Sequence, residues 1–353
     1  SILKRYSWQE TGKRSVKALE RVQREQLGSK PKIAVFIPRP DGLSAVGKVV
    51  AEGHAALSEV FDVYYYYEKG SYGGSTRPNF LQYVAHYASA DSFGVEKYAE
   101  YSAVFYHVGN SDYHISSIAH QLYLPGYTIL HDTNIGEAYR IMLEKGMISQ
   151  DRYDAEVNVN QLLAVDDSSY LGSVLAAQRG MLAHSQYALK ASEKVLTRKC
   201  PAIFAALPTH VPSMPRKRRY ENITVGLAGI LAGIKGVKVI ESLVGRHEYS
   251  DVKFKLFGYD FTGDDSLEKL SAHQNVTVST NLTDFDFQYN LSRLDIFVNY
   301  RMKYQGETSL STLEAMRHGV VVIVRNIGWY AELPDNVVVK VDDEADVESA
   351  LTA

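Results

Sequence analysis

The sequence has 353 residues, a formal net charge of −3 and an apolar fraction of 45%. This length allows two domains with sizeable cores, and the charge lacks the basic excess of a chain that mainly binds nucleic acid. The single cysteine, Cys200, excludes an internal disulfide framework or a cysteine-based metal cluster. No apolar stretch reaches the roughly 20 residues of a membrane-spanning helix. We therefore expect a cytoplasmic protein that does not bind nucleic acid.

The first half of the chain predicts one helix and then alternating strands and helices. Charged and apolar residues at helical spacing indicate an amphipathic helix within residues 1–30. Short apolar runs then predict buried parallel strands, and longer amphipathic stretches predict helices. The predicted strands are 32–38, 60–67, 103–106 and 127–130, and the predicted helices are 45–57, 136–145 and 168–183. This alternation is typical of parallel β-α-β winding.

A proline-rich and basic linker, residues 211–220, precedes a second α/β unit. Beyond it the predicted strands are 223–227, 252–257, 276–278, 295–300 and 320–324, and the predicted helices are 235–244 and 308–318. We expect two Rossmann-like, doubly wound domains, residues 31–210 and 221–353, which face each other across a cleft. In such sheets ligands bind beyond the carboxyl ends of the strands.

An acidic, glycine-containing loop precedes the helix predicted at 308–318. Backbone N–H groups at a helix N-terminus bind diphosphates, and carboxylates bind sugar hydroxyls. Glu307 lies in the loop, and Glu314 follows about two helical turns later. Alone, Glu314 would be taken for an exposed helix residue. The whole stretch 305–334, however, resembles the donor-binding signature of the family-4 retaining glycosyltransferases of GT-B fold.

The resemblance implies roles for the residues of this stretch. Glu314 would hold the nucleotide ribose, and Glu307 would hold the transferred sugar. Gly306, Thr308 and Ser309 would complete the donor site. The family commonly has seven residues between its two glutamates, whereas six separate Glu307 from Glu314.

A second glycine-rich stretch, residues 226–236, resembles the first strand and loop of the family's donor domain, which ends in Lys-Gly. The resemblance implies that Lys235 neutralises the diphosphate leaving group, a role that suits its point charge. Ile230 stands near the place where the family often has an arginine. Arg301, just before the acidic loop, is our candidate for that charge.

Polar residues also follow strands predicted in the first half of the chain. His131 matches the family's histidine near the donor sugar, and Asp132 is expected to orient its imidazole or to bind acceptor. His107 and Asn110 are predicted on the acceptor side. Two residues of the first loop are expected to approach the donor phosphate: Gly42 and Ser44.

The resemblance implies sugar transfer from a nucleotide-sugar to a glycan, lipid-linked or protein acceptor, with retention of anomeric configuration. The leaving-group charge would be met by lysine, arginine and helix amides, so no metal ion or other cofactor is expected. The segments at 38–47 and 105–114 are most like those of multidomain bacterial glycan-assembly transferases. Residues 6–8 resemble the end of such a transferase, which suggests an adjacent module and a missing final helix in the second domain; a helical extension of a separate enzyme explains them equally well.

Alternative functions remain open. The unusual glutamate spacing and the missing arginine are compatible with a non-catalytic binding or assembly module. An NAD-dependent enzyme is less favoured, because neither glycine-rich loop gives a G-x-G-x-x-G fingerprint. Glycoside hydrolysis lacks a recognisable carboxylate pair. The basic run 216–219 could approach anionic lipid at the inner face of the membrane, although we favour a solvated linker.

Overall fold

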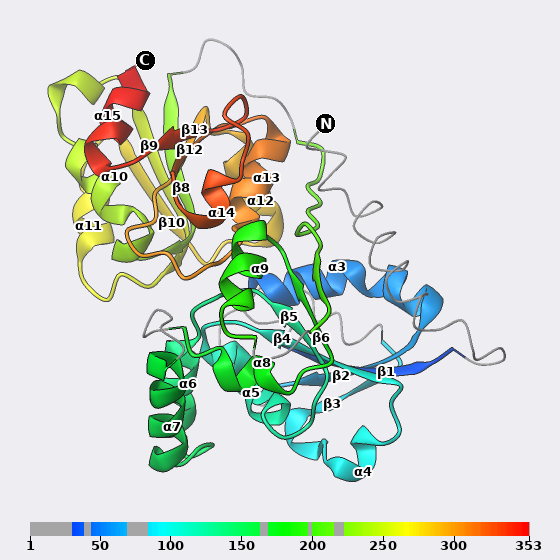
Figure 1. The fold of residues 1–353 in the computed structure, drawn as a ribbon. Coiled ribbons are helices and arrows are strands. Elements are labelled where there is room, and N and C mark those ends of the chain that lie inside the picture. The colour runs from blue at the N-terminus through cyan, green and yellow to red at the C-terminus, as the bar shows by residue number, and fades with distance from the viewer. Residues whose placement is uncertain are drawn as a thin grey trace. The chain divides into compact units, whose positions relative to one another are not determined.

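The computed structural model describes residues 30–38, 44–68, 84–162, 169–196, 200–214 and 222–352. The chain divides into two compact units (Figure 1). The first comprises Ser1–Pro208 with the loop Gln305–Thr308, and the second comprises Thr209–Tyr304 with Ser309–Ala353. The helix predicted within residues 1–30, and Gly42 in the first loop, lie outside the described residues, as do residues 215–221.

In the described residues of the first unit, seven parallel strands form one sheet in the order β3-β2-β1-β4-β5-β6-β7. The strands are β1 (Lys32–Ile37), β2 (Asp62–Tyr67), β3 (His86–Ser89), β4 (Ala103–Val108), β5 (Tyr127–Leu130), β6 (Gly180–Ala183) and β7 (Ala202–Phe204). The helices are α3 (Ala45–Val60), α4 (Val95–Tyr98), α5 (Ile115–Gln121), α6 (Gly136–Glu144), α7 (Gln150–Leu162), α8 (Gly172–Ala176) and α9 (Gln186–Glu193).

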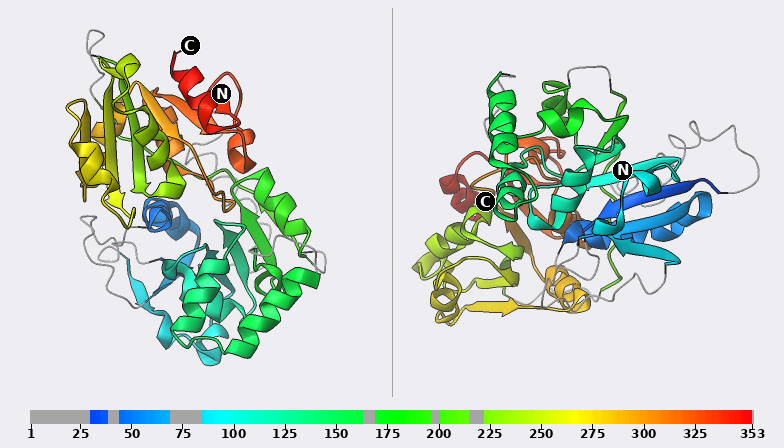
Figure 2. Two further views of the ribbon diagram at one scale, coloured as in Figure 1. Left: turned by 90° about the vertical axis from the view of Figure 1, so that its left-hand side faces the viewer. Right: turned by 90° about the horizontal axis from the view of Figure 1, so that it is seen from below.

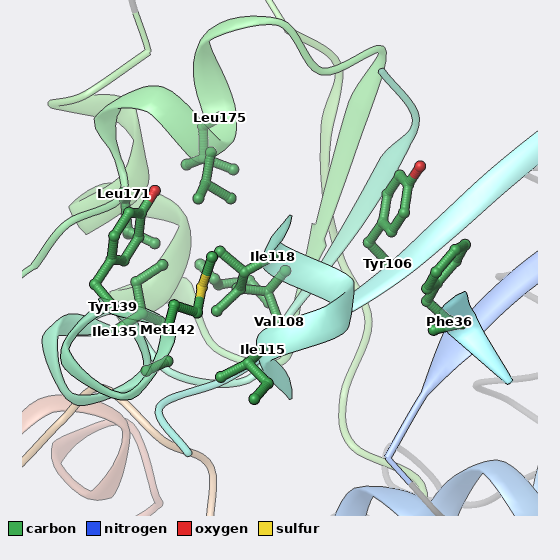
Figure 3. Close-up of a cluster of buried hydrophobic side chains, with 14 of the residues drawn as sticks. Phe36, Tyr106, Val108, Ile115, Ile118, Ile135, Tyr139, Met142, Leu171 and Leu175 are labelled. Atoms are coloured by element: carbon green, nitrogen blue, oxygen red, sulfur yellow. The ribbon is translucent and has the colours of Figure 1, made fainter. Parts of the chain in front are cut away.

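Both faces of the middle of this sheet are buried, which explains why the central strand β1 is apolar along almost its whole length. On β1, Val35 packs in a cluster with residues of α3, whereas its neighbour Phe36 packs in a second cluster with residues of α5 and α6. Successive side chains of a strand point to opposite faces, so one strand serves both clusters. Figure 3 shows part of the second cluster, where Val108, Ile118 and Met142 meet. Each large side chain buried in this way stabilises the fold by about 1.5–3 kcal/mol.

In the described residues of the second unit, six parallel strands form a sheet in the order β10-β9-β8-β11-β12-β13, seen from two further sides in Figure 2. The strands are β8 (Thr224–Leu231), β9 (Lys253–Asp260), β10 (Val276–Thr280), β11 (Ile296–Asn299), β12 (Val321–Arg325) and β13 (Val339–Val341). Helices α10 (Val237–Leu243), α11 (Ser266–Ser271) and α15 (Glu344–Thr352) bury one face, and α12 (Asp284–Ser292), α13 (Leu310–His318) and α14 (Gly328–Ala331) lie on the other (Figure 1). The predicted architecture of two doubly wound α/β units is confirmed.

The helix predicted over residues 168–183 is wrong. Residue 168 lies outside the described part of the chain, and only α8 is helical in the remainder, which ends as strand β6. Gly180 pairs with Tyr127 of β5, and a Cβ on Gly180 would lie 2.9 Å from the Tyr127 ring. Pairing with β5 therefore decides the conformation here, against a local pattern that favours a helix.

Gly258 makes a close backbone contact that should be essential to the second unit. It pairs with Gly229 across β8 and β9, it has φ +139°, and an added Cβ would overlap the Gly229 carbonyl oxygen. We expect Gly258→Ala to lower the free energy of unfolding by about 3 kcal/mol, since backbone strain adds to the overlap. Gly263→Ala is the matched control, because Gly263 also has positive φ, +72°, but open space around it. Urea denaturation should show the larger loss at Gly258; equal losses would contradict the steric explanation.

Candidate active site

Four histidines gather at the carboxyl edge of the first sheet. His107 is the penultimate residue of strand β4, His131 follows β5 and His184 follows β6. His114 ends a short 3₁₀ turn, Asp112–His114, that precedes α5. The ring centres of His107, His114 and His184 lie 5.1, 5.9 and 5.1 Å from that of His131. We call these four residues the histidine cluster.

Hydrogen bonds fix the rings of the histidine cluster. Nδ1 of His107 lies 2.8 Å from Nε2 of His131. Nδ1 of His114 lies 2.9 Å from the carbonyl oxygen of His107, and Nδ1 of His184 lies 2.8 Å from that of Ala205. A carbonyl oxygen only accepts, so His114 and His184 donate from Nδ1. Because each ring has a partner of known kind, its orientation is defined.

The cluster is neutral at physiological pH. Burial and, to a smaller extent, the neighbouring histidines lower the pKa of His107 to about 3. Burial likewise lowers the pKa of His114 and of His184 to about 4, and that of His131 well below its ordinary value. Removing a cation from water costs free energy, so burial keeps the imidazoles unprotonated. His131 can therefore offer one N–H donor or one nitrogen acceptor rather than a positive charge.

Backbone groups hold the acidic residue next to His131. The Asp132 carboxylate accepts a hydrogen bond of 2.7 Å from the backbone N–H of Asn110. The side-chain oxygen of Asn110 in turn accepts from the backbone N–H of Ala138, in the first turn of α6. The His131 ring forms its hydrogen bond with the His107 ring. Of the residues that the sequence analysis assigned to this half, the structure thus brings together His107, Asn110, His131 and Asp132.

The acidic loop Gln305–Thr308 packs within the first unit. The backbone N–H groups of Thr133 and Asn134 donate to the Gln305 carbonyl oxygen at 2.9 and 3.0 Å. The Glu307 carboxylate accepts from the backbone N–H of Gln305 at 3.0 Å. Gly306 has φ +88°, and its Cα lies so close to Thr133 that no Cβ fits. Only glycine satisfies both requirements at this position.

Helix α13 begins in a polar, hydrogen-bonded turn. Ser309 caps the helix by accepting from the backbone N–H of Thr312. The Asn299 side chain, at the end of β11, donates to the hydroxyls of Ser309 and Thr312 at 3.0 and 2.5 Å. Glu314 lies in the same helix and is 2% exposed. A buried carboxylate is unusual on a helix of this kind and favours a specific role over that of a solvated residue.

Two cationic side chains of the second unit sit on loops that are joined to each other. Lys235 ends the 3₁₀ turn Gly233–Lys235 before α10. Arg301 is buried, and its Nε donates to the Tyr330 hydroxyl at 2.9 Å. The backbone N–H of Met302 donates to the carbonyl oxygen of Ile234, so the residues next to Arg301 and Lys235 are hydrogen-bonded. Both charges therefore belong to one loop assembly at the carboxyl edge of the second sheet.

The remaining predicted positions are less informative. Ser44 precedes α3 in extended conformation without capping the helix, and Gly42 lies outside the described residues. Thr308 is half-buried in the acidic loop. In the described part of the chain, no three His, Cys, Asp or Glu side chains are placed to hold a metal ion. None of its helices is both long and apolar enough to cross a membrane.

Comparison with known proteins identifies the fold. No family model and no curated protein matches the sequence. The structure is similar to HepE of Anabaena, solved with UDP and glucose (13% identity, TM-score 0.60, 91% of this chain and 88% of that chain). It is also similar to sucrose-phosphate synthase from Thermosynechococcus elongatus (13%, 0.61, 91% and 89%) and to WaaG, a glycosyltransferase involved in lipopolysaccharide biosynthesis (12%, 0.56, 90% and 89%). The chain thus has the GT-B fold of two Rossmann-like units.

Acid should destabilise the first unit through the histidine cluster. The pKa of an unfolded histidine is about 6.5, whereas burial holds the folded values at about 3 for His107 and about 4 for His114 and His184. Below pH 6.5 the unfolded chain therefore binds more protons, so stability falls as the pH falls toward 4. Each of these histidines costs about 1 kcal/mol by about pH 5.5.

This loss can be measured by urea unfolding at about pH 7.5 and 5.5, followed by pulsed hydrogen exchange in peptides of β4 and β5. His184→Gln should reduce the difference between the two pH values by about one histidine's share. His273→Gln is the control, because His273 is exposed. If both variants keep the full pH dependence, the cluster is not its source.

Gly306→Ala should loosen the acidic loop. The added Cβ would overlap the Thr133 hydroxyl and would lie 2.6 Å from the Thr133 backbone nitrogen, which cannot rotate away as a side chain can. We expect the amide protons of Thr133 and Asn134 to exchange with solvent about 10–100-fold faster, as their bonds to Gln305 are lost. Gly319→Ala is the control, since Gly319 has φ +77° and open space. Unchanged exchange in Gly306→Ala would refute the close packing described above.

Proposed function

We propose that this protein is a glycosyltransferase that uses a nucleotide-sugar donor. The observation that carries the proposal is the burial of Glu314 on α13. Glu314 follows the acidic loop closely in sequence, and the N-terminus of its helix is capped by Ser309. A carboxylate has two oxygens that accept hydrogen bonds, and a pair of ribose hydroxyls offers two donors to it. Glu314 is thus proposed to hold the nucleotide ribose.

The donor diphosphate is proposed to bind where Lys235 and Arg301 are joined by the Met302–Ile234 hydrogen bond. When the sugar bond to the diphosphate breaks, negative charge develops on the leaving phosphate. Fixed cations and helix N–H groups stabilise that charge without reorganising, which lowers the barrier. Arg301 is held in place by its bond to Tyr330, in agreement with this role. In this proposal no metal ion or other cofactor takes part.

The first unit is proposed to act on the sugar and on the acceptor. His131 is neutral, so it binds a sugar hydroxyl rather than a phosphate. Glu307 is proposed to contact the transferred sugar, and Asp132 and Asn110 the acceptor. By the resemblance given above, the sugar is transferred with retention, the acceptor is a glycan, a lipid-linked or a protein group, and the reaction takes place in the cytoplasm. The structures of HepE with UDP and with UDP-glucose support UDP-sugars as the first donors to test.

A second candidate is a binding or assembly module that holds a nucleotide-sugar or glycan without transferring sugar. The residues between Glu307 and Glu314 number six where the family commonly has seven, and Ile230 stands near the place of an arginine. Ile230 is 38% exposed, and its side chain carries no charge. Release of UDP from UDP-glucose by the purified protein distinguishes the two candidates, because only a transferase cleaves the donor.

A thermal-shift screen tests the donor site. UDP, GDP, dTDP, CMP and NAD are added at concentrations up to 100 times the dissociation constant, where a bound ligand stabilises the folded state by about 2.7 kcal/mol. We expect one nucleoside diphosphate to stabilise the wild type. Glu314→Gln should weaken its binding about 10–100-fold, since a hydrogen bond to a charged group is worth about 1.5–3 kcal/mol.

Glu268→Gln is the control, because Glu268 is an exposed residue of α11. It should bind the nucleotide as the wild type does. Melting temperatures without ligand show whether Glu314→Gln remains folded. Stabilisation by NAD alone, or by no nucleotide, would overturn the proposed function; equal loss in both variants would overturn the role of Glu314.

A further inference from the structure

The hydrogen bond between His107 and His131 has an unusual geometry. The ring planes lie within 12° of each other, and the ring centres are 5.1 Å apart while the two nitrogens are 2.8 Å apart. The separation of the centres equals the nitrogen–nitrogen distance plus one ring radius at each end. The bond therefore lies along the line of the centres and in both ring planes, the alignment in which an N–H···N bond is strongest.

A bond between two neutral imidazoles couples the tautomer of one ring to that of the other. If Nε2 of His131 carries the proton, Nδ1 of His131 is an acceptor; if Nδ1 of His107 carries it, Nδ1 of His131 is a donor. Each ring holds one proton, so the second nitrogen of His131 always takes the role opposite to the first. With His107 in place, a change of tautomer in His131 requires His107 to change as well, whereas without His107 the tautomer of His131 could change alone.

The position of His107 is itself fixed. It lies in strand β4 between Tyr106 and Val108, both fully buried, and is 7% exposed. The carbonyl oxygen of His107 accepts from Nδ1 of His114, which ties the strand end to the following turn. His184, by contrast, packs its ring at the same distance from His131 but forms its hydrogen bond with Ala205. Of these two equally close rings, His107 is the one bonded to the imidazole of His131.

We propose that His107 is a positioning residue that holds His131 in a single tautomer and orientation, so that Nδ1 of His131 presents one defined hydrogen-bonding role to a sugar hydroxyl. This assigns to His107 a function different from the acceptor contact expected from the sequence. Orientation of a functional histidine through its second nitrogen is a general means of fixing its chemistry. Only the kinetic part of the proposal rests on the proposed function.

Nitrogen-15 NMR of the full chain, labelled at histidine, tests the proposal without a ligand. The signals of His131 are assigned by their loss in His131→Gln. We expect the wild type to show one protonated and one unprotonated nitrogen in His131, and a coupling between the two rings across the hydrogen bond. His107→Phe keeps the ring volume but removes the bond, and should give averaged signals from two tautomers.

Two further variants separate positioning from packing. His107→Asn places an amide near the position of Nδ1 and should restore a single tautomer. His184→Gln removes an equally close ring that has no bond to His131, and should leave the His131 signals unchanged. With UDP-glucose as probe, His107→Phe should lower kcat for UDP release about 10–100-fold with little change in KM, and His107→Asn should recover most of that loss.

The outcomes are distinguishable. A mixture of tautomers in the wild type, the absence of coupling between the rings, or an unchanged single tautomer in His107→Phe would each overturn the proposal. The wild-type spectrum and His107→Asn decide the question even where His107→Phe does not fold. If the tautomers behave as expected but the wild type releases no UDP, the proposed donor chemistry fails while the positioning by His107 stands.

Discussion

All strands in both described sheets run parallel, and this constraint determines where polar groups gather. The carboxyl ends of parallel strands lie at one edge, so residues that follow different strands become neighbours there. His131 and His184 come together because they follow β5 and β6, which are adjacent in the sheet although a long helical segment separates them in the sequence. The faces of the sheet are occupied by apolar side chains, which leaves this edge as the place for chemistry.

The same constraint carries an energetic cost. Three imidazoles of the histidine cluster, those of His107, His114 and His184, are buried and lose their hydration, which lowers the pKa of each. Hydrogen bonds to backbone carbonyl groups and between rings offset part of this cost. A neutral, dry and aligned set of groups is less stable than an apolar core of the same volume would be. Its retention is better explained by function than by stability.

Much of the fold could be predicted from local sequence, because strands buried on both faces are continuous apolar runs. This is why β1, β5 and β12 were found close to their observed bounds. The edge strand β3 could not be predicted in this way, because its residues include the polar His86 and Ser89 and are partly exposed. Helix α7 was not predicted, because its sequence is almost uniformly polar and its few apolar residues show little helical periodicity.

The candidate site was predicted only in part, and one error explains the main omission. The sequence pattern predicts the end of a helix at residues 180–183, and it therefore does not identify His184 as a strand-end residue like His131. Gly180 begins the short buried strand β6, and the rule that polar residues after parallel strands meet at one edge of the sheet then also applies to His184. His114 left no such signal, because its place beside His107 depends on a turn between β4 and α5. Contacts of that kind are set by tertiary packing and not by periodicity.

The acidic groups of the site show what backbone hydrogen bonds achieve that ion pairs do not. Asp132 and Glu307 each accept from a backbone N–H, which fixes the direction of a carboxylate without neutralising it as a lysine or arginine would. A backbone donor also loses no side-chain freedom, so the bond costs little entropy. Carboxylates held in this way can accept from hydroxyl donors and are in place before any substrate binds. Preorganisation of this kind, together with neutral histidines, suits the recognition of a polyhydroxylated ligand better than that of an anion.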